Sequence, residues 1–412
     1  MTITLKAYES IVGRPVLAQL EELAENLPGI RVVHINSTRT GGGVAEILER
    51  LVPLMNELGI ETSWEVIEGN EPFFEVTKSM HNGLQGNPVT LSPSARRAYE
   101  ETNERNAQRL CPLLQGADFV FIHDPQPAAL LKFCSNRRGL WFWRCHIDVS
   151  QPFRIVWKYL LPFVEGYDAS IFSMAQFAQQ LRHPQFLMRP SIDPLSEKNC
   201  ELPTKELKEV QNRFGLDPSR PLLVQVSRFD RFKDPVGVIK AYQLVRKFCP
   251  AQLVLVGGSA TDDPEGEAVL EEVNEAAKGD PDIHVILLPS DSHRTINALQ
   301  RLADVILQKS TKEGFGLTVT EGLWKGKPVI GGNTGGIRLQ VFDYHTGFLV
   351  DSPEGAAHRI RFLFQYPDKL RRMGEKGKEF VRENFLLTRH LREYLTLMLG
   401  LRQGLADHLI VE

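Results

Sequence analysis

Short apolar runs alternate with longer segments of helical spacing along most of the 412 residues. The runs are rich in β-branched and aromatic residues, and this alternation is typical of βα units on a parallel sheet. It predicts an α/β protein with two Rossmann-like, doubly wound parallel-sheet domains. The first set of runs covers residues 31–35, 64–67, 119–123, 140–145 and 169–173, and the second covers 222–226, 253–256, 284–288, 304–307 and 328–330.

The alternation breaks at residues 189–199, where two prolines and several turn-forming residues interrupt regular structure. We expect the hinge between the domains there. The sequence predicts an N-terminal domain over residues 1–190, a second domain over 191–387, and a helix over 388–412 that can pack on either domain. Two such domains in tandem are expected to face each other across a cleft at the carboxyl ends of their strands, where ligands of these sheets bind.

Charge and cysteine usage limit the classes of function. A net charge of −3 provides no basic field to gather nucleic acid or anionic lipid, so we expect neither as a partner. No apolar run approaches the roughly 18 residues of a membrane span, and the first residues lack the pattern of a secretory signal. The cysteines form no C-x-x-C pair, which argues against a disulfide framework and a zinc site, and favours the cytoplasm. They are Cys111, Cys134, Cys145, Cys200 and Cys249.

The strongest local motif spans residues 310–324, directly after an apolar run of the second set. Two carboxylates, Glu313 and Glu321, flank a Gly-Phe-Gly turn that opens a helix. Free amides at a helix start offer hydrogen-bond donors and partial positive charge to phosphate or hydroxyl oxygens, and Glu321 can accept from a diol such as a ribose. Alternatively, Glu313 caps the helix and Glu321 is a solvated surface charge, which leaves the two glycines unexplained. The amides belong to Gly314, Phe315, Gly316 and Leu317.

Two cations follow the first run of the second set, at the predicted carboxyl end of a strand. Arg228 offers a planar fork and Lys233 a point charge, and together they can face a diphosphate. Alternatively, the two cations only pair with Asp230 and Asp234 on the surface. Their position directly after a strand favours the binding role.

A glycine run at Gly41–Gly43 follows the first apolar run of the chain and precedes an amphipathic helix. It lacks G-x-G-x-x-G spacing, so a nicotinamide dinucleotide site loses most of its support. Gly42 and Gly43 can still bring the helix start close to a ligand phosphate or to an acceptor. Glycine-rich turns between strand and helix are also common structural devices, so this signal is weak on its own.

Polar side chains also gather at strand ends in the first domain, in the segments 123–126 and 146–148. Neutral imidazole and carboxylate suit hydrogen bonding to sugar hydroxyls, although either histidine can equally be a satisfied core residue. No Ser-His-Asp order and no H-E-x-x-H helix occurs among them. The pair Asp280 and Asp282 precedes a strand in a turn, so we predict no metal site there. The candidates are His123, Asp124, Gln126, His146 and Asp148.

Taken together, Arg228, Lys233 and the Glu313–Glu321 motif with seven intervening residues resemble the sugar-donor site of retaining glycosyltransferases of family four, which have the GT-B fold. Within that family the chain is most similar to the trehalose glycosyltransferring synthases. The similar segments are 146–150, 190–196 and 227–233. One departure is the hinge, where Pro-Ser-Ile-Asp at 190–193 replaces the usual Asn-Gly-Val-Asp.

This resemblance implies a nucleoside-diphosphate glucose (UDP-, ADP- or GDP-glucose) as donor, glucose as acceptor, and reversible formation of α,α-trehalose with retention. It implies no tightly bound cofactor, although Mg²⁺ can accompany the nucleotide sugar, and it allows a homodimer. Arg228, Lys233 and Glu313 are then the catalytic residues. The implied sugar-donor contacts are Gly42, Gly43, His146, Arg228, Lys233, Gly314, Phe315, Gly316, Leu317 and Glu321, and the implied acceptor contacts are Asp124, Gln126 and Asp148.

Other functions stay open at this stage. A trehalose phosphorylase resembles this group and uses inorganic phosphate where the nucleotide lies. A non-catalytic nucleotide-sugar-binding protein and a nucleotide-sugar epimerase use similar domains. Neither of the last two explains the paired glutamates together with the polar residues of the first domain as well as a transferase does.

Overall fold

The computed structural model of the chain describes residues 4–40, 42–134, 136–258 and 264–405. The chain divides into two compact units. Unit 1 comprises Met1–Ser191 together with Leu387–Glu412, and unit 2 comprises Ile192–Leu386. The division falls within the break at residues 189–199, and the segment after Leu386 groups with unit 1.

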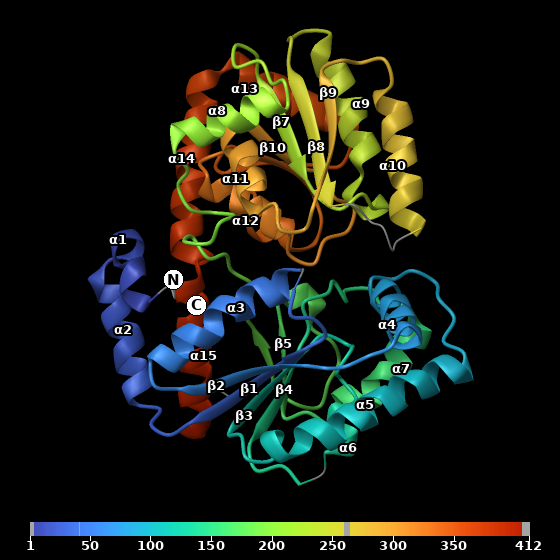
Figure 1. The fold of residues 1–412 in the computed structure, drawn as a ribbon, viewed down its shortest axis with the longest axis vertical. Coiled ribbons are helices and arrows are strands. Elements are labelled where there is room, and N and C mark those ends of the chain that lie inside the picture. Colours follow the sequence, from blue (N-terminus) through green and yellow to red (C-terminus); the bar gives the residue numbers. More distant parts are fainter. Residues whose placement is uncertain (1–3, 41, 135, 259–263, 406–412) are drawn as a thin grey trace. The chain divides into compact units, whose positions relative to one another are not determined.

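Unit 1 is built on a six-stranded parallel sheet in the order β2-β1-β3-β4-β5-β6 (Figure 1). Its central strands are apolar over nearly their whole length, because helices cover both faces of the sheet. One group of helices comprises α2, α3 and α15, and another comprises α4 to α7. The strands are β1 Arg31–Asn36, β2 Glu61–Val66, β3 Phe119–His123, β4 Leu140–Arg144, β5 Ala169–Phe172 and β6 Gln185–Leu187. The helices are η1 Leu5–Tyr8, α1 Glu9–Val12, α2 Arg14–Glu25, α3 Gly43–Glu57, α4 Glu71–Leu84, α5 Pro93–Leu114, α6 Leu130–Phe133, α7 Arg154–Val164, η2 Ala175–Phe177 and α15 Leu387–Arg402.

Unit 2 repeats this plan with a parallel sheet in the order β12-β11-β10-β7-β8-β9 (Figure 1). The strands are β7 Leu222–Val226, β8 Gln252–Gly258, β9 Ile283–Leu288, β10 Val305–Gln308, β11 Val329–Gly332 and β12 Gly347–Val350. The helices are α8 Thr204–Arg213, η3 Arg231–Lys233, α9 Pro235–Arg246, α10 Pro264–Ala277, α11 His293–Leu302, α12 Leu317–Trp324, η4 Gly335–Leu339, α13 Pro353–Gln365 and α14 Pro367–Asn384. The predicted fold class, two Rossmann-like parallel-sheet domains, is confirmed.

Of the twelve strands in the described residues, ten were predicted from the sequence, and β6 and β12 were not. Both are edge strands of three or four residues. β6 carries only partly buried or exposed residues, so it lacks the buried apolar run that marked the other strands.

Each sheet has one point at which the strand order reverses. In unit 1 the chain leaves β1 for β2 on one side and then crosses to β3 on the other; in unit 2 it runs from β7 to β8 and β9 before β10 pairs on the far side of β7. Loops at the carboxyl ends of the two strands at such a point diverge and leave a crevice for ligands. The fold therefore marks the β1 and β3 loops in unit 1 and the β7 and β10 loops in unit 2.

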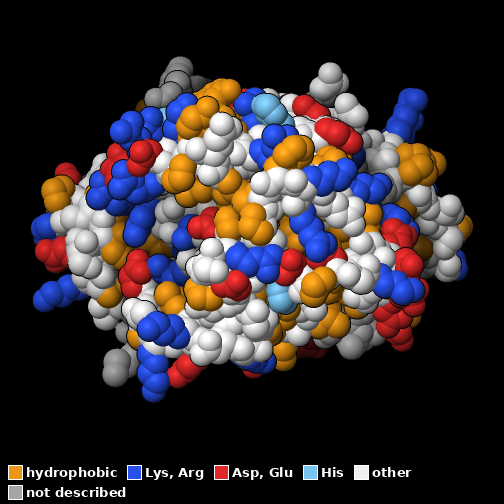
Figure 2. Space-filling model, turned by 90° about the horizontal axis from the view of Figure 1, so that it is seen from above, with side chains coloured by type: hydrophobic (Ala, Val, Ile, Leu, Met, Phe, Trp, Pro, Cys, Tyr) orange, Lys and Arg blue, Asp and Glu red, His pale blue; other side chains and the backbone are white. Residues whose placement is uncertain are grey.

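Figure 2 shows one face of the molecule, on which Lys and Arg side chains are interspersed with Asp, Glu and apolar side chains. None of the helices in the described ranges combines the length and the apolar character needed to cross a bilayer.

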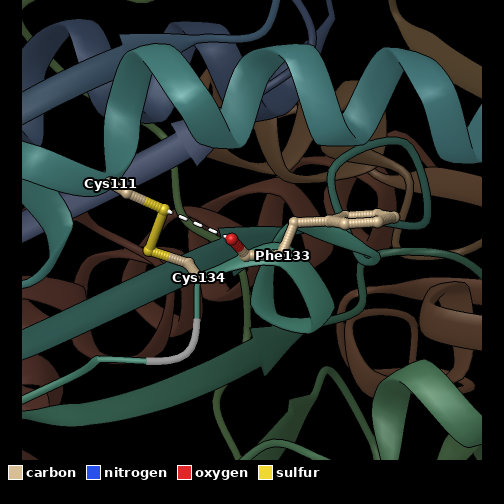
Figure 3. Close-up of a disulfide and its surroundings, with 3 residues drawn as sticks. All are labelled: Cys111, Phe133 and Cys134. Atoms are coloured by element: carbon tan, nitrogen blue, oxygen red, sulfur yellow. Dashed lines mark hydrogen bonds between the residues drawn. A yellow bond between two sulfur atoms is a disulfide. The ribbon is translucent and has the colours of Figure 1, made fainter.

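The expectation that the chain has no disulfide is wrong. Cys111, near the end of α5, is bonded to Cys134, which directly follows α6, with 5.7 Å between the two Cα atoms (Figure 3). The sulfur of Cys111 also lies 3.8 Å from the carbonyl oxygen of Phe133. The two cysteines stand 23 residues apart in sequence, and only the packing of α6 against α5 brings them together. Cys145, Cys200 and Cys249 are free.

Candidate active site

The loops after β7 and β10 in unit 2 meet at the switch point of the sheet. Lys233 Nζ lies 2.6 Å from Glu313 Oε2, and the two side chains are only 17% and 10% exposed. Ser310 Oγ donates a hydrogen bond to the same carboxylate oxygen at 3.1 Å. The amide of Thr311 donates to the carbonyl oxygen of Phe232 at 2.8 Å, which joins the two loops through their backbones as well. The structure thus brings Lys233 and Glu313 together.

Arg228 is placed differently from Lys233. Its side chain is 73% exposed and pairs with Asp230 at 3.2 Å, as the surface alternative for this residue anticipated. Asp230 also accepts a hydrogen bond from the Lys233 amide at 3.1 Å and so begins the short helix η3. Arg228 is therefore free to reorient toward a ligand at little energetic cost, because an exposed ion pair contributes only about 0–1 kcal/mol.

Asp234 forms a second link between these loops instead of pairing with Lys233. Its backbone is left-handed, with φ of 47°, and Oδ1 accepts from the amide of Gly237, which caps α9. Its other oxygen forms an ion pair with Lys309, a buried residue in the loop after β10. Lys309 was not predicted, and Ser310 was not singled out within its motif, although both stand at the end of a strand, the position that marked the other candidates.

The Gly-Phe-Gly turn forms the start of α12, as its sequence indicated. Gly316 precedes the helix with φ of 83°, a conformation that favours glycine, and Leu317 is the first helical residue. Phe315 is buried and packs edge-on against Phe385 at 5.5 Å, so only its backbone is available to a ligand. Close packing requires glycine in the turn at residues 331–336, because a Cβ on Gly335 would lie 1.7 Å from the carbonyl oxygen of Glu313.

Glu321 lies on α12 and is only 3% exposed, so it is not a solvated surface charge. Gln300 Nε2 donates to Glu321 Oε2 at 3.1 Å and fixes the carboxylate. One turn later, Lys325 donates to the Glu321 carbonyl oxygen at 3.3 Å and to Asn199 Oδ1 at 3.0 Å. Burial lowers the pKa of Lys325 to about 7. Glu321 is thus held in one place by neighbours that sequence reasoning did not single out.

In unit 1, Asp124 occupies the switch point directly after β3. Its backbone is left-handed, with φ of 65°, which is unusual for a residue other than glycine. Oδ1 accepts a hydrogen bond from the backbone amide of His146 at 2.8 Å, and the Asp124 carbonyl oxygen accepts one from Trp143 Nε1 at 3.0 Å. Burial raises the pKa of the Asp124 carboxyl to about 7. The group therefore titrates near neutral pH.

His146, after β4, is hydrogen-bonded through Nε2 to His123 Nδ1 at 3.0 Å. His123 Nε2 is in turn hydrogen-bonded to His34 Nδ1 on β1, also at 3.0 Å. His34 and His123 are buried, while His146 is half-buried. His34 was not predicted as a site residue, because a single histidine inside an apolar strand gives no signal of its own.

The other candidates of unit 1 have more local surroundings. Asp148 Oδ1 accepts hydrogen bonds from the amide and the hydroxyl of Ser150, at 3.0 and 2.6 Å. Gln126 Oε1 is buried without a hydrogen-bond partner in the described part of the chain. Gly42 precedes α3 with φ of 84°, and Gly43 is the first residue of that helix, while Gly41 lies outside the described residues.

A cavity of about 770 Å³ in unit 1 is lined by residues of α5, α6, α7 and the adjoining segments, and it contains none of the predicted site residues. Within the described ranges, no three His, Cys, Asp or Glu side chains are grouped as a metal ion would require.

Comparison with known proteins places this geometry in a class. Residues 208–380 match the model of the family "Glycosyl transferases group 1", and residues 34–179 match that of "Trehalose synthase, N-terminal domain". A sucrose-phosphate synthase from Thermosynechococcus elongatus has a similar structure, with a TM-score of 0.70 over 91% of this chain and 100% of that chain. At 17% identity this likeness shows the fold alone. Fold and family models together define a glycosyltransferase with the GT-B fold.

More similar relatives narrow this class to a family. A trehalose synthase from Pyrococcus horikoshii is 46% identical over 96% of this chain and 95% of its own length. A trehalose phosphorylase from Grifola frondosa is 29% identical over 88% of this chain, but the match covers only 56% of that protein. The chain belongs to the trehalose synthase family of glycosyltransferases. The resemblance recognised in the sequence is thereby confirmed.

Proposed function

We propose that the protein transfers glucose from a nucleoside-diphosphate glucose to glucose, forming α,α-trehalose and a nucleoside diphosphate, in a reversible reaction. The observation that supports this proposal most strongly is the meeting of Lys233 and Glu313 beside the start of α12, at the switch point of unit 2. A cation and free helix amides suit a diphosphate, and carboxylates suit sugar hydroxyls.

Each candidate site residue of unit 2 has a role in this proposal. Lys233 and Arg228 bind the diphosphate and neutralise the charge that develops as it leaves, which requires Arg228 to turn away from Asp230. The backbone amides of Gly314, Phe315, Gly316 and Leu317 and the carboxylate of Glu313 hold the donor glucose. Glu321, fixed by Gln300, accepts hydrogen bonds from the ribose diol. Mg²⁺ can accompany the diphosphate.

In unit 1 we assign His146 to the donor sugar, with Gly42 and Gly43 at the start of α3 near its phosphates. Asp124, Gln126 and Asp148 are assigned to the acceptor glucose. Gln126 supports this assignment, since its Oε1 is buried and has no partner in the described ranges, so a sugar hydroxyl can satisfy it. Asp148 is the weaker candidate because Ser150 already donates twice to one of its oxygens.

The proposed transfer proceeds on one face of the donor sugar and retains its configuration. The bond from the anomeric carbon to the diphosphate oxygen breaks, and a bond from that carbon to the acceptor oxygen forms on the same face. The acceptor hydroxyl gives its proton to the departing diphosphate oxygen. No protein side chain has to act as general base, which is consistent with a site made mainly of cations, amides and fixed carboxylates.

The direct test is to incubate the protein with glucose and, in separate tubes, UDP-, ADP- and GDP-glucose, and to identify the disaccharide by NMR. Formation of α,α-trehalose with at least one donor supports the proposal, and a parallel tube with EDTA tests the need for Mg²⁺. Phosphorolysis of trehalose by inorganic phosphate without any nucleotide would instead identify a phosphorylase. Binding without turnover, or epimerisation of the donor without acceptor, would also contradict the transferase.

A further inference from the structure

Three histidines of unit 1 lie in series beneath the predicted sugar-binding end of the sheet. His34 on β1 is bonded through Nδ1 to His123 Nε2, and His123, the last residue of β3, is bonded through Nδ1 to His146 Nε2. Both distances are 3.0 Å. We call His34, His123 and His146 the histidine chain. Only its last member is half-buried, so the chain leads from the protein interior to the candidate site.

All three rings of the histidine chain are neutral at physiological pH. Burial lowers the pKa of His34 to about 3. Burial also lowers the pKa of His123 and of His146 well below the usual value, and the positive charge of the buried Arg144 lowers both further. Each ring therefore carries a single N–H, and its other nitrogen can only accept a hydrogen bond.

This restriction couples the three tautomers. His123 is bonded through both of its nitrogens, so it must donate at one and accept at the other. Because both hydrogen bonds in the histidine chain join the Nδ1 of one ring to the Nε2 of the next, only two arrangements satisfy both bonds. Either all three rings carry the proton on Nδ1, or all three carry it on Nε2. The state of the outer ring is therefore set by the inner two.

The inner end of the histidine chain, at His34, distinguishes these two arrangements. His34 Nε2 is buried and has no hydrogen-bond partner in the described part of the chain. It lies in a ring stack with Phe121, at 4.9 Å, and edge-on to Tyr394 of α15, at 5.5 Å. A proton on this nitrogen would be a buried N–H without an acceptor, which folded proteins avoid more strictly than an unused acceptor.

The charged groups packed around the histidine chain also favour the arrangement with the protons on Nδ1. Arg144 Nε and Nη1 and Arg389 Nε are also buried without partners in the described ranges, as is His390 Nε2, so this region already holds three donor nitrogens without acceptors. Of the nearby carboxylates, Glu393 is paired with Arg389 within α15, and Asp124 accepts from the His146 amide. An N–H on His34 Nε2 would add a further unpartnered donor, whereas a lone pair there does not.

We infer that His34 and His123 are positioning residues that hold His146 in the Nδ1–H tautomer, so that the nitrogen facing out of the chain is a hydrogen-bond donor. The consequence for catalysis rests on the proposed function: His146 would then donate to a hydroxyl oxygen of the donor sugar. Asp124 accepts a hydrogen bond from the His146 amide and so fixes the backbone that carries this ring.

The test is ¹⁵N NMR of the full chain labelled at histidine, recorded without ligand, in which the two ring nitrogens report which one carries the proton. The His146 signals are assigned by their loss in His146→Gln. We expect a protonated Nδ1 and an unprotonated Nε2 in the wild type. His123→Asn places an amide N–H where Nδ1 of His123 lies and should preserve this tautomer, whereas His123→Leu removes the donor and should give a mixture.

His183→Leu is the matched control, since His183 belongs to unit 1 and bonds to Ser170 outside the histidine chain. It should leave the His146 signals unchanged, and circular dichroism should show that all variants fold. With nucleotide sugar, His123→Leu should lower kcat/KM by about tenfold or less, and His123→Asn should restore most of it.

A protonated Nε2 on His146 in the wild type, or the same tautomer in His123→Leu as in the wild type, would overturn the inference. The NMR result does not depend on turnover. If the tautomer is as inferred and no nucleotide sugar reacts with any acceptor, the proposed function fails while the positioning role of His34 and His123 stands.

Discussion

Lys233 Nζ lies 2.6 Å from Glu313 Oε2, although 80 residues separate them in sequence. The contact exists because β7 and β10 are neighbours in the sheet of unit 2, so the loops that follow them leave the same edge side by side. The carboxylate of Glu313 stands beside Lys233, where we propose that the diphosphate binds. A sugar diphosphate therefore has to share Lys233 with Glu313 or displace it, and the two residues should differ in what they contribute.

Lys233→Ala should weaken nucleoside-diphosphate binding by at least about tenfold, because a charge-assisted hydrogen bond to phosphate is lost. Glu313→Gln should bind the diphosphate at least as tightly, because the neutral amide no longer competes for Lys233, and should lower kcat instead, since Glu313 is assigned to the sugar. Calorimetry with the nucleoside diphosphate and steady-state kinetics measure the two effects. Lys278→Ala is the control, as Lys278 forms an exposed pair with Glu275 in the same unit. Equal loss of diphosphate affinity in Lys233→Ala and Glu313→Gln would contradict the division of roles.

Arg228→Ala should lower kcat by about 10²–10³-fold, which is the usual effect of removing one preorganised donor from a transition state. Its thermal midpoint should stay close to that of the wild type, because the side chain is 73% exposed and its pair with Asp230 contributes little. Arg231→Ala is the control and should keep near-normal kcat, since Arg231 is a second exposed arginine of the same loop. A folded Arg228→Ala enzyme with near-normal kcat would remove the proposed role.

The position of Lys233 and Glu313 at strand ends of unit 2 could be expected from the sequence for a physical reason. Loops at the carboxyl ends of parallel strands share one edge, so Lys233 and Glu313 could be expected near each other once their strands were recognised. The order of the strands was not predicted. Only this order shows that β7 and β10 are adjacent, and hence that Lys309 can pair with Asp234.

Residues that act through another side chain were harder to find. His34 stands inside an apolar strand, and Gln300 lies on α11 with no motif around it, so their contacts with His123 and Glu321 depend on the packed fold. The bond between Cys111 and Cys134 was missed for the same reason. Charge and spacing in the sequence indicate which residues can bind a ligand, but not which neighbours hold them.

Gly335→Ala should disturb the site from a distance. The residue has φ of 44°, and an added Cβ would lie 1.7 Å from the carbonyl oxygen of Glu313, so the loop that carries this carboxylate must shift. Gly279→Ala is a matched control, because Gly279 has φ of 79° and open space around it. The control should lose only the about 1–2 kcal/mol that a left-handed backbone costs an L-residue. The free energy of unfolding, measured with denaturant, and kcat should both fall further in Gly335→Ala than in the control. Equal losses of stability in the two variants, with unchanged kcat, would show that Gly335 does not position the Glu313 loop.

Asp124 should make stability depend on pH between about 4 and 7. Burial raises the pKa of this carboxyl to about 7 in the folded protein, while in the unfolded chain it is near its ordinary value of 3.8. Between these values the folded state holds a proton that the unfolded state has lost, so stability is fully present below about pH 4 and decreases as the pH rises toward 7. The decrease is on the order of a few kcal/mol.

Asp124→Asn should remove this dependence, because an amide stays neutral throughout. Urea denaturation midpoints between pH 5 and pH 8 measure it, and the variant should gain stability relative to the wild type as the pH rises to 7, with no further gain above. Asp217→Asn is the control: hydrogen bonds from Ser219 lower the pKa of Asp217, so this carboxylate is ionised in both states over this range and the variant should differ from the wild type by a constant amount. Parallel pH profiles for the wild type and Asp124→Asn would show that Asp124 is ionised in the folded protein, and an ionised Asp124 could only accept hydrogen bonds from the acceptor sugar.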